Sequence, residues 1–289
     1  MLDQAQRLRQ LAVDKAESKT KEGNRAKILT VTSGKGGVGK SNFVVNLSIS
    51  LSKLGKRVLI FDADIGMAND DVLMGFLPKY NINDVLFKNK DLEDVMITGP
   101  YGVKLIAGGS GLSRVEELTE EQREGFLDKL ASLQDFDYII MDTGAGINRS
   151  VLGFIACCEE LVIITTPEPT SLTDSYSLLK AVNHFKIKSK AKVIINRTLD
   201  AKEGIMTYNK FNNAVSNFLK MDIEFLGSIA EDRKVVQAVR EQQPFMISYP
   251  NCDAAEDINK IARKLMGETV VATEMNVQGL FKKLFSIFS

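Results

Sequence analysis

Short apolar runs alternate along the chain with segments of helical periodicity. A run such as Val58–Phe61 is apolar at every position, which is typical of parallel strands covered on both faces. The runs that predict strands are Ile28–Ser33, Arg57–Asp62, Val103–Ala107, Asp137–Asp142, Leu161–Thr166, Lys192–Asn196 and Glu224–Ile229; spacings of three and four residues predict helices over Asn42–Leu54, Glu120–Leu133, Leu172–Phe185 and Ala254–Met266. This alternation predicts an α/β fold with a doubly wound, mostly parallel sheet, whose ligands bind at the carboxyl ends of the strands.

Two flanks differ from this core. Residues 1–25 predict a helix over Asp3–Lys15 followed by a charged linker, and residues 267–289 predict a linker and a short apolar, basic helix. We therefore expect three segments: 1–25, a nucleotide-binding domain over 26–266, and 267–289.

Charge and cysteine content narrow the classes of function. Lys plus Arg and Asp plus Glu each number 37, and a protein that coats nucleic acid usually has a basic excess. No apolar run reaches the length of a membrane span and the N-terminus lacks a secretory signal, so we expect a cytoplasmic protein. The three cysteines form no CxxC pair; Cys157 and Cys158 are expected to pack in the core, and His184, the one histidine, is interpreted as structural.

A phosphate-binding loop is the most specific motif. Gly34–Ser41 matches GxxxxGK[ST] between a predicted strand and a predicted helix. Backbone amides of such a loop surround phosphate oxygens, Lys40 reaches the β- and γ-phosphates, and the Ser41 hydroxyl ligates Mg²⁺. The residues expected to contact the nucleotide here are Gly34, Lys35, Gly36, Gly37, Val38, Gly39, Lys40, Ser41 and Asn42. The sequence therefore predicts a P-loop NTPase.

Acidic residues end two other predicted strands. Asp62 and Asp64 close one strand, and Asp142 closes another before the glycine-containing segment Thr143–Gly146. Carboxylates in these positions suit the magnesium shell and the attacking water, and the glycines suit a switch that responds to the γ-phosphate. Spacing alone does not separate the roles of Asp62 and Asp64, and a helix N-cap is the other interpretation of Asp62.

Lys35 gives the loop the form KGGxGKS, and together with the acidic motifs it resembles the MinD/ParA group of deviant Walker ATPases over residues 26–266. The resemblance implies a slow ATPase that uses ATP and Mg²⁺ and forms an ATP-dependent homodimer. It implies that Lys35 reaches the partner subunit's phosphates, that Lys40 binds the phosphates of its own subunit, and that Asp64 positions the attacking water. Asp62 and Asp142 are then expected in the magnesium shell with Ser41.

The same resemblance implies a base-binding edge. Asn196 would read adenine, with Arg197 beside it, and the segment Ala230, Glu231 and Asp232 would cover the base. Ala230 stands where many relatives have proline. No NKxD guanine motif is present, so ATP is favoured over GTP.

Within the group, the segments Asp62–Asn69 and Asp142–Ile147 look most like the flagellar-number ATPases (FlhG, also called FleN or YlxH). The N-terminal residues Asp3, Gln4, Ala5, Arg7 and Arg9 resemble the element by which that branch stimulates the FlhF-type GTPase. A plain amphipathic start helix is the alternative. The resemblance further implies contacts with flagellar switch (C-ring) proteins.

The C-terminal tail gathers apolar residues on one helical face beside two lysines. The residues expected to touch membrane are Val277, Leu280, Phe281, Lys282, Lys283, Leu284, Phe285 and Phe288. A large apolar face with basic residues describes an interfacial helix on the cytoplasmic face of an anionic membrane. The alternative is a last helix docked on the core, and both hold if the helix docks in the nucleotide-free monomer.

These observations predict a nucleotide-timed switch ATPase that regulates flagellar number or placement and lies peripherally at the inner face of the cell membrane when ATP is bound. A MinD-like division-site selector and a ParA-like DNA-partition ATPase are the alternatives, although no specific nucleic acid is expected as a partner. An iron–sulfur carrier of the same superfamily is disfavoured because it needs paired cysteines.

Overall fold

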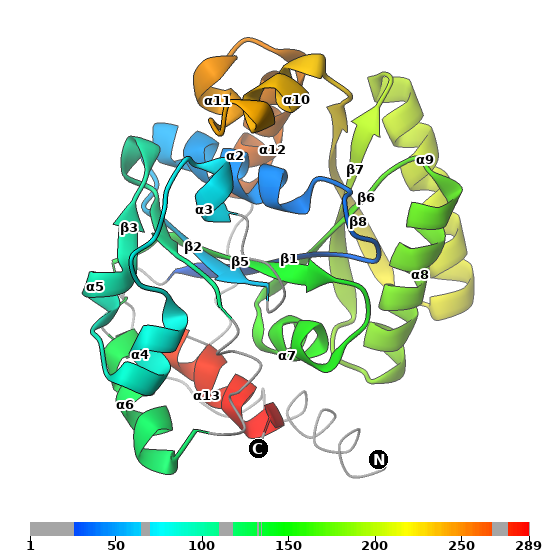
Figure 1. Cartoon of the computed structure of the whole chain (residues 1–289). Helices are drawn as coiled ribbons and strands as arrows, with labels where there is room; N and C mark the ends of the chain where they lie inside the picture. Colours follow the sequence, from blue (N-terminus) through cyan, green and yellow to red (C-terminus); the bar gives the residue numbers. More distant parts are fainter. Residues whose placement is uncertain are drawn as a thin grey trace.

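One eight-stranded sheet organises the computed structural model of the chain (Figure 1), which describes residues 26–64, 70–109, 118–131, 133, 135–267 and 277–288. The strand order is β3-β4-β2-β5-β1-β6-β7-β8, and only β3 runs antiparallel to its neighbour. The strands are β1 (Lys27–Ser33), β2 (Val58–Ala63), β3 (Met96–Thr98), β4 (Lys104–Ile106), β5 (Tyr138–Ala145), β6 (Glu160–Thr165), β7 (Lys190–Thr198) and β8 (Asp222–Ala230). The predicted doubly wound, mostly parallel α/β fold is confirmed.

Helices cover both faces of this sheet. One face carries α2 (Lys40–Lys53), α3 (Asp70–Leu73), α10 (Arg233–Arg240), α11 (Phe245–Ser248) and α12 (Asp253–Gly267); the other carries α4 (Ile82–Lys88), α5 (Leu92–Val95), α6 (Glu120–Ala131), α7 (Arg149–Cys157), α8 (Pro169–His184), α9 (Ala201–Ala214) and α13 (Val277–Phe288). Two short turns, η2 (Pro100–Gly102) and η4 (Val215–Leu219), complete the described elements. Successive residues of β1 point into opposite cores, Ile28 toward α13 and Leu29 toward α2. This two-sided burial explains why the strand runs are apolar throughout.

The predicted strand runs correspond to seven of the observed strands, with ends displaced by a few residues. The sequence did not reveal β3, which is three residues long at the edge of the sheet. So short a segment shows too little alternation to stand out from a loop. Cys157 and Cys158 are buried, Cys157 on α7 and Cys158 directly after it, as expected. Among the described residues, no helix has both the length and the apolar character needed to cross a bilayer.

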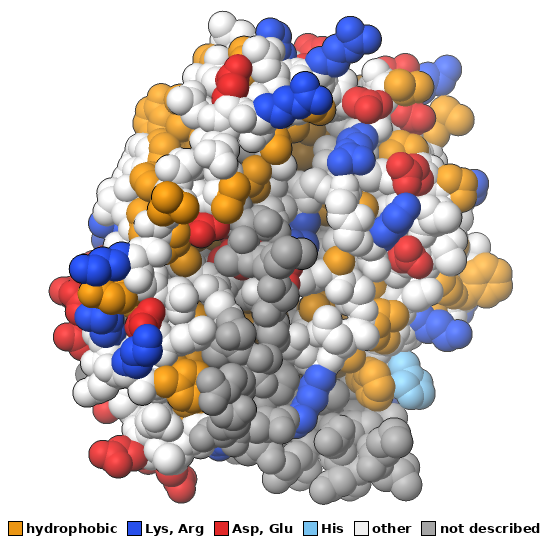
Figure 2. Space-filling model, in the orientation of Figure 1, with side chains coloured by type: hydrophobic (Ala, Val, Ile, Leu, Met, Phe, Trp, Pro, Cys, Tyr) orange, Lys and Arg blue, Asp and Glu red, His pale blue; other side chains and the backbone are white. Residues whose placement is uncertain are grey.

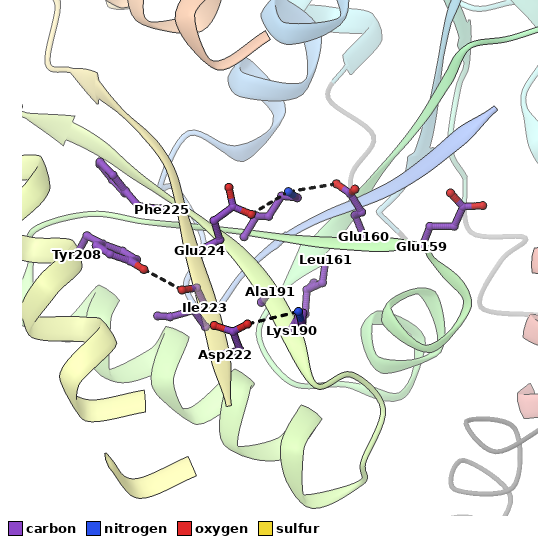
Figure 3. Close-up of a pocket in the computed structure, with 11 residues that line it drawn as sticks. Glu159, Glu160, Leu161, Lys190, Ala191, Tyr208, Asp222, Ile223, Glu224 and Phe225 are labelled. Atoms are coloured by element: carbon purple, nitrogen blue, oxygen red, sulfur yellow. Dashed lines mark hydrogen bonds and ion pairs between the residues drawn. The ribbon is translucent and has the colours of Figure 1, made fainter. Parts of the chain in front are cut away.

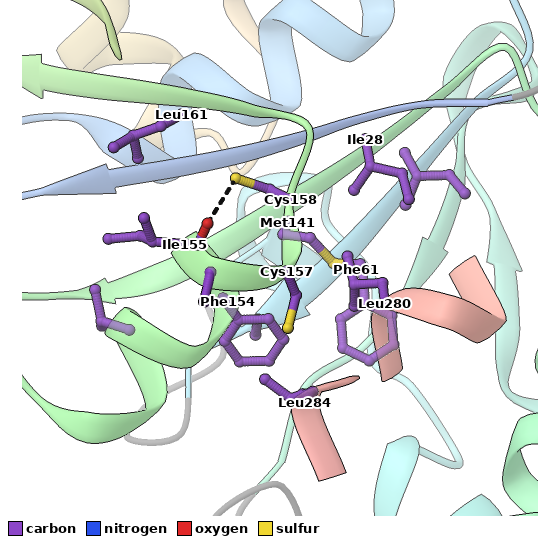
Figure 4. Close-up of a cluster of buried hydrophobic side chains, with 14 of the residues drawn as sticks. Ile28, Phe61, Met141, Phe154, Ile155, Cys157, Cys158, Leu161, Leu280 and Leu284 are labelled. Atoms are coloured by element: carbon purple, nitrogen blue, oxygen red, sulfur yellow. Dashed lines mark hydrogen bonds between the residues drawn. The ribbon is translucent and has the colours of Figure 1, made fainter. Parts of the chain in front are cut away.

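The C-terminal helix α13 is docked on the core. Leu280, Phe281, Leu284 and Phe285 are buried in the same hydrophobic cluster as the residues of α6 and α7. Figure 4 shows Leu280 and Leu284 beside Phe61 of β2 and Cys157 of α7. The ring of Phe281 lies 5.1 Å from those of both Phe61 and Phe126, measured between centroids. The apolar face of the tail is therefore covered by the sheet domain in this state.

The phosphate loop is held against α8 by a contact that only glycine allows. A Cβ atom on Gly34 would lie 2.2 Å from the carbonyl carbon of Asp174 and 2.3 Å from the amide nitrogen of Ser175. Both atoms belong to the helix backbone, which cannot turn aside as a side chain can. By contrast, a Cβ atom on Gly36 would meet nothing within 4 Å. The first glycine of the motif thus lets the loop lie directly against the α8 backbone.

We expect Gly34→Ala to lower the free energy of unfolding by about 1–3 kcal/mol, because overpacking forces the loop and α8 apart. Gly36→Ala is the matched control in the same loop and should stay within about 0.5 kcal/mol of the parent protein. Urea unfolding without nucleotide, followed by circular dichroism, measures both. Equal stability of the two variants would contradict the proposed role of this contact.

Candidate functional site

The phosphate loop joins the end of β1 to the start of α2. Gly37 and Gly39 have φ values of 77° and 93°, which lie in the left-handed region that glycine adopts readily. Gly39 is the N-cap of α2, so Lys40 and Ser41 form its first turn. The loop therefore ends at the positive end of the helix dipole, an arrangement that binds phosphate.

A buried ion pair lies at the centre of the site. The Lys40 Nζ atom lies 2.8 Å from Asp142 Oδ1, and the two side chains are 10% and 2% exposed. Burial opposes the charged ammonium, but the charge and hydrogen bond of Asp142 outweigh burial, so the pKa of Lys40 is raised. Asp142 is on β5, and parallel pairing sets it level with Asp62 on β2. The sheet thus brings together three residues that the sequence places 22 and 80 positions apart.

The two acids after β2 have different surroundings. The buried Asp62 carboxylate accepts a hydrogen bond from the Asp64 amide at 3.0 Å. Gly108 lies so close that its Cβ would stand 2.7 Å from the Asp62 carbonyl oxygen, and a Cβ on Gly144 would stand 3.2 Å from Asp64 Oδ1. The last residues of β5 therefore lie next to the Asp64 side chain.

Asp70 belongs to the same site, although the sequence pattern did not single it out. It is the first residue of α3 and is fully buried, and within the described part of the chain no donor hydrogen-bonds to its carboxyl oxygens. Burial, followed by the negative charges of Asp142 and Asp62, raises the pKa of the Asp70 carboxyl well above its usual range. Adjacent Asp70 and Asp71 look like an ordinary acidic helix start in the sequence, so no local signal separates them.

Lys35 turns away from the phosphate loop. Its Nζ atom lies 3.1 Å from both Glu168 Oε2 and Thr170 Oγ1, at the start of α8. The Lys35 and Glu168 side chains are 40% and 56% exposed. Ion pairs this exposed are weak, so the lysine is available to another acceptor. Neither partner was predicted, because both lie more than 130 positions away in the sequence.

The residues predicted to read the base gather at the carboxyl ends of β7 and β8. Asn196 Nδ2 donates to the Val38 carbonyl at 2.7 Å, and Arg197 Nη2 donates to the Gly37 carbonyl at 2.8 Å. Both side chains therefore brace the phosphate loop. Ala230 ends β8 and its amide donates to Asp257, while Asp232 accepts from the Lys234 amide as the N-cap of α10. Their contact with a base remains a prediction.

The residues around Lys40 fit Mg²⁺ with a phosphate ligand. Asp62, Asp70 and Asp142 are buried carboxyls, and the oxygens of Asp70 lack any donor. Buried carboxylates need a cation or hydrogen-bond donors. Lys40 brings a single positive charge to these three carboxyl groups. Ser41, Asp62 and Asp142 would hold the ion. Within the described part of the chain, no three His, Cys, Asp or Glu side chains group closely enough to hold a metal alone; Mg²⁺ commonly keeps waters and takes phosphate oxygens besides one or two carboxylates.

A pocket of about 450 Å³ lies elsewhere, at the amino ends of β6, β7 and β8 (Figure 3). Its charged side chains are paired, Lys190 with Asp222 at 3.6 Å and Lys192 with Glu224 at 3.1 Å. The pocket lies at the amino ends of the strands, whereas the phosphate loop follows the carboxyl end of β1. The predicted motifs therefore gather at the other end of the strands.

One set of predicted residues lies outside the described part of the chain, and another stands apart from this site. The proposed partner-binding residues Asp3, Gln4, Ala5, Arg7 and Arg9 lie outside the described residues. The proposed membrane residues of α13 lie on the opposite face of the sheet from α2, with Lys282 exposed. Phe61 links the two regions, because it contacts Phe281 and directly precedes Asp62.

Comparison with known proteins agrees with this geometry. The ParA family, whose sequence model is described as "NUBPL iron-transfer P-loop NTPase", matches residues 24–266. The antiactivator FleN of Pseudomonas aeruginosa is 35% identical over 239 residues, which cover 82% of this chain and 85% of that protein. The flagellum site-determining protein YlxH of Helicobacter pylori is 36% identical over 264 residues, 89% of each protein.

Solved structures give the same result. The MinC:MinD cell division complex of Aquifex aeolicus matches with a TM-score of 0.67 and 27% identity over 86% of this chain and 98% of that one. The septum site-determining protein MinD of Pyrococcus horikoshii, complexed with Mg-ADP, matches with a TM-score of 0.65 and 25% identity over 84% and 96%. The chain therefore belongs to the ParA/MinD family of P-loop NTPases.

Proposed function

We propose that this chain is an ATP-dependent, dimerising switch ATPase of weak intrinsic activity that associates with membrane and regulates flagellar number and placement. The observation that carries the proposal is the similarity to FleN and YlxH over more than four-fifths of the chain. The site supports it, because the loop, Lys40 and the strand-end acids form one phosphate-facing cluster.

The chain's own residues have separate tasks in hydrolysis. The loop amides and Lys40 bind the phosphates, which draws the Lys40 ammonium away from Asp142. Asp64 orients the attacking water next to the glycine-containing segment after β5. Ser41, Asp62 and Asp142 would hold Mg²⁺, which would neutralise part of the phosphate charge when bound. Lys35 of a second copy supplies a further positive charge, so turnover depends on dimerisation.

The position of Lys35 supports its action across a dimer. Its ammonium is directed to Glu168 and Thr170 at the surface, not to the loop of its own subunit. An exposed ion pair contributes about 0–1 kcal/mol, whereas a phosphate group offers a stronger, charge-assisted contact. ATP in a facing subunit would therefore draw Lys35 off Glu168.

The dimerisation state with ATP tests this proposal through three variants. Lys35→Ala should bind ATP and stay monomeric, because only the contact to the partner's phosphates is lost. Lys40→Ala should also stay monomeric, but because nucleotide no longer binds. Asp64→Ala should accumulate a long-lived ATP dimer, since the water is no longer oriented. Light scattering after gel filtration gives the mass, and a fluorescent ATP analogue gives the affinity.

Glu168→Gln is the matched control, since it removes the intramolecular partner of Lys35 and leaves the lysine itself. It should dimerise at least as well as the parent protein. A Lys35→Ala variant that dimerises and hydrolyses ATP at the parental rate would disprove the action of Lys35 across the dimer.

The docked helix α13 supports a membrane switch. Its four buried side chains (Leu280, Phe281, Leu284 and Phe285) each gain about 1.5–3 kcal/mol from leaving water. The interior of a lipid leaflet offers the same side chains a similar gain, so docking and membrane insertion compete closely. Lys282 and Lys283 favour an anionic membrane by about 1 kcal/mol each.

Dimerisation favours membrane insertion of α13 over docking, because a dimer carries two such helices. Once one helix of a dimer is inserted, insertion of the second is intramolecular, so binding strengthens without new contacts. The contact of Phe281 with Phe61, the residue before Asp62, gives the nucleotide site a direct route to the docked helix. The face in Figure 2 carries Lys and Arg interspersed among Asp and Glu, with no large basic patch among the coloured residues. We therefore assign membrane attraction to the tail itself.

The labelling rate of Cys157 measures release of α13. Cys157 is buried beside α13, and burial raises the pKa of its thiol to about 12, so it reacts slowly with maleimide at neutral pH. In a Cys158→Ala/Cys252→Ala background, which keeps this single cysteine, ATP plus anionic vesicles should raise the labelling rate at least about tenfold over ADP. Vesicle sedimentation should rise in parallel and weaken in high salt.

Phe281→Glu separates docking from insertion. The buried carboxylate should expel α13 from the core, so Cys157 labels quickly without vesicles, while sedimentation in ATP is lost. Ser286→Glu adds the same charge on the exposed face of α13 and should still sediment. Sedimentation of Phe281→Glu at the parental level would show that α13 is only a core helix.

The N-terminal segment is proposed to stimulate an FlhF-type GTPase, on the resemblance of Asp3–Arg9 alone. A peptide of residues 1–13 should accelerate GTP hydrolysis by that GTPase several-fold, and the Gln4→Ala peptide should do so less. Phosphate release measures both, with a peptide of scrambled order as control. No acceleration by the parent peptide would make the segment a plain start helix. Contacts with flagellar switch proteins are part of the same proposal.

A division-site function is the second candidate, because the fold matches MinD in its complex with MinC. Affinity capture from a flagellated cell lysate, with ATP and with ADP, separates the two. ATP-dependent recovery of an FlhF-type GTPase or flagellar switch proteins favours the first function. Recovery of septum-site proteins favours the second.

A further inference from the structure

Among the described residues, no hydrogen-bond donor reaches the buried carboxyl of Asp70. Its side chain is 0% exposed, and the side chain within hydrogen-bond reach of it is another buried acid, Asp142. A buried polar group without partners costs about 1–3 kcal/mol, and more if it is charged. The adjacent Asp71 shows the ordinary alternative, since it is partly exposed and accepts a hydrogen bond from the Val72 amide at 2.8 Å. An apolar residue would fill the position of Asp70 at lower cost.

The neighbours of Asp70 identify what the position faces. Asp142, Asp62 and Lys40 are the charged groups that act on it most strongly. These are the residues that meet at the carboxyl ends of β2 and β5 and at the start of α2. Asp70 therefore reaches the cation and phosphate end of the site from a fourth element, α3, which packs on α2.

We propose that Asp70 is a positioning residue of the magnesium site, which accepts hydrogen bonds from waters bound to Mg²⁺. The raised pKa of Asp70 means that its carboxyl favours a proton beside Asp142, and an ionised carboxylate there needs hydrogen-bond donors. The described side chains do not supply donors to its oxygens, whereas the waters that Mg²⁺ retains would. The inference rests on the proposed nucleotide switch, because Mg²⁺ enters this site with nucleotide.

An outer position fits the structure better than direct ligation. Within the described residues, Asp62, Asp70 and Asp142 do not converge closely enough to hold a metal as a group of three. Carboxylates that bind the ligands of a metal still set its affinity, typically by 10–100-fold. Asp70 would thereby make nucleotide binding depend more steeply on Mg²⁺ than Ser41, Asp62 and Asp142 alone would.

Asp70→Asn tests the proposal, because it keeps the shape of the side chain and removes its charge. Fluorescent ADP is titrated at a series of Mg²⁺ concentrations and in EDTA. We expect the Mg²⁺ concentration for half-maximal effect to rise about tenfold or more, with ADP affinity in EDTA within about twofold of the parent. Asp71→Asn, the matched control on the same helix, should leave both values unchanged.

Several results distinguish the possible failures. A Mg²⁺ requirement of Asp70→Asn within twofold of the parent would overturn the inference and make Asp70 a structural acid. Asp70→Ser, which is smaller, is measured as well in case the asparagine variant does not fold, and it should also require more Mg²⁺. If the parent protein binds no ADP at any Mg²⁺ concentration, the proposed nucleotide switch itself fails.

Discussion

The buried pair of Lys40 and Asp142 is the interaction on which the rest of the site depends. At 2.8 Å and almost without solvent, neither charge can leave unless another group replaces it. Breaking such a pair without a substitute costs about 3–5 kcal/mol. A bound phosphate can replace Asp142 as the partner of Lys40. A divalent cation can replace Lys40 as the partner of Asp142. The charge balance of the site therefore favours nucleotide and Mg²⁺ arriving together over either one alone.

The sheet connects the site with the core beneath α13. Asp142 and Asp62 are level on neighbouring strands, and Phe61, one residue earlier, points to the opposite face, toward α13. Alternation along β2 thus places one residue in the site and the next in the core that covers the tail helix. A shift of β2 along β5 would move Phe61 and Asp62 together, because they are neighbours on one strand. The close-packed interior would have to rearrange to accept such a shift. The candidate nucleotide site and the docked helix α13 thus share this strand.

Local patterns explain why the fold was largely predictable and the site only partly so. Strands such as β2 and β5 are apolar throughout because helices cover both faces, and the phosphate loop has a spacing that chance rarely produces. The partners of Lys35, by contrast, lie on α8, and the bracing of the loop by Asn196 and Arg197 comes from β7. Such contacts depend on how strands are ordered in the sheet, which periodicity does not report.

Asp70 and α13 are two further cases in which the sequence alone does not determine how a residue is buried. The sequence shows that one face of the tail must be buried, but protein core and membrane satisfy an apolar face equally, so the pattern alone leaves the choice open. For Asp70 the sequence suggests a solvated helix start, and only the packing of α3 on α2 buries it among other acids. In the proposed switch, the tail would exchange its core contact for a membrane, and Asp70 would gain hydrogen-bond donors from metal-bound waters. Both changes would follow from a ligand that binds one arrangement of these groups better than the other, because a ligand shifts an equilibrium only by its difference in affinity for the two arrangements.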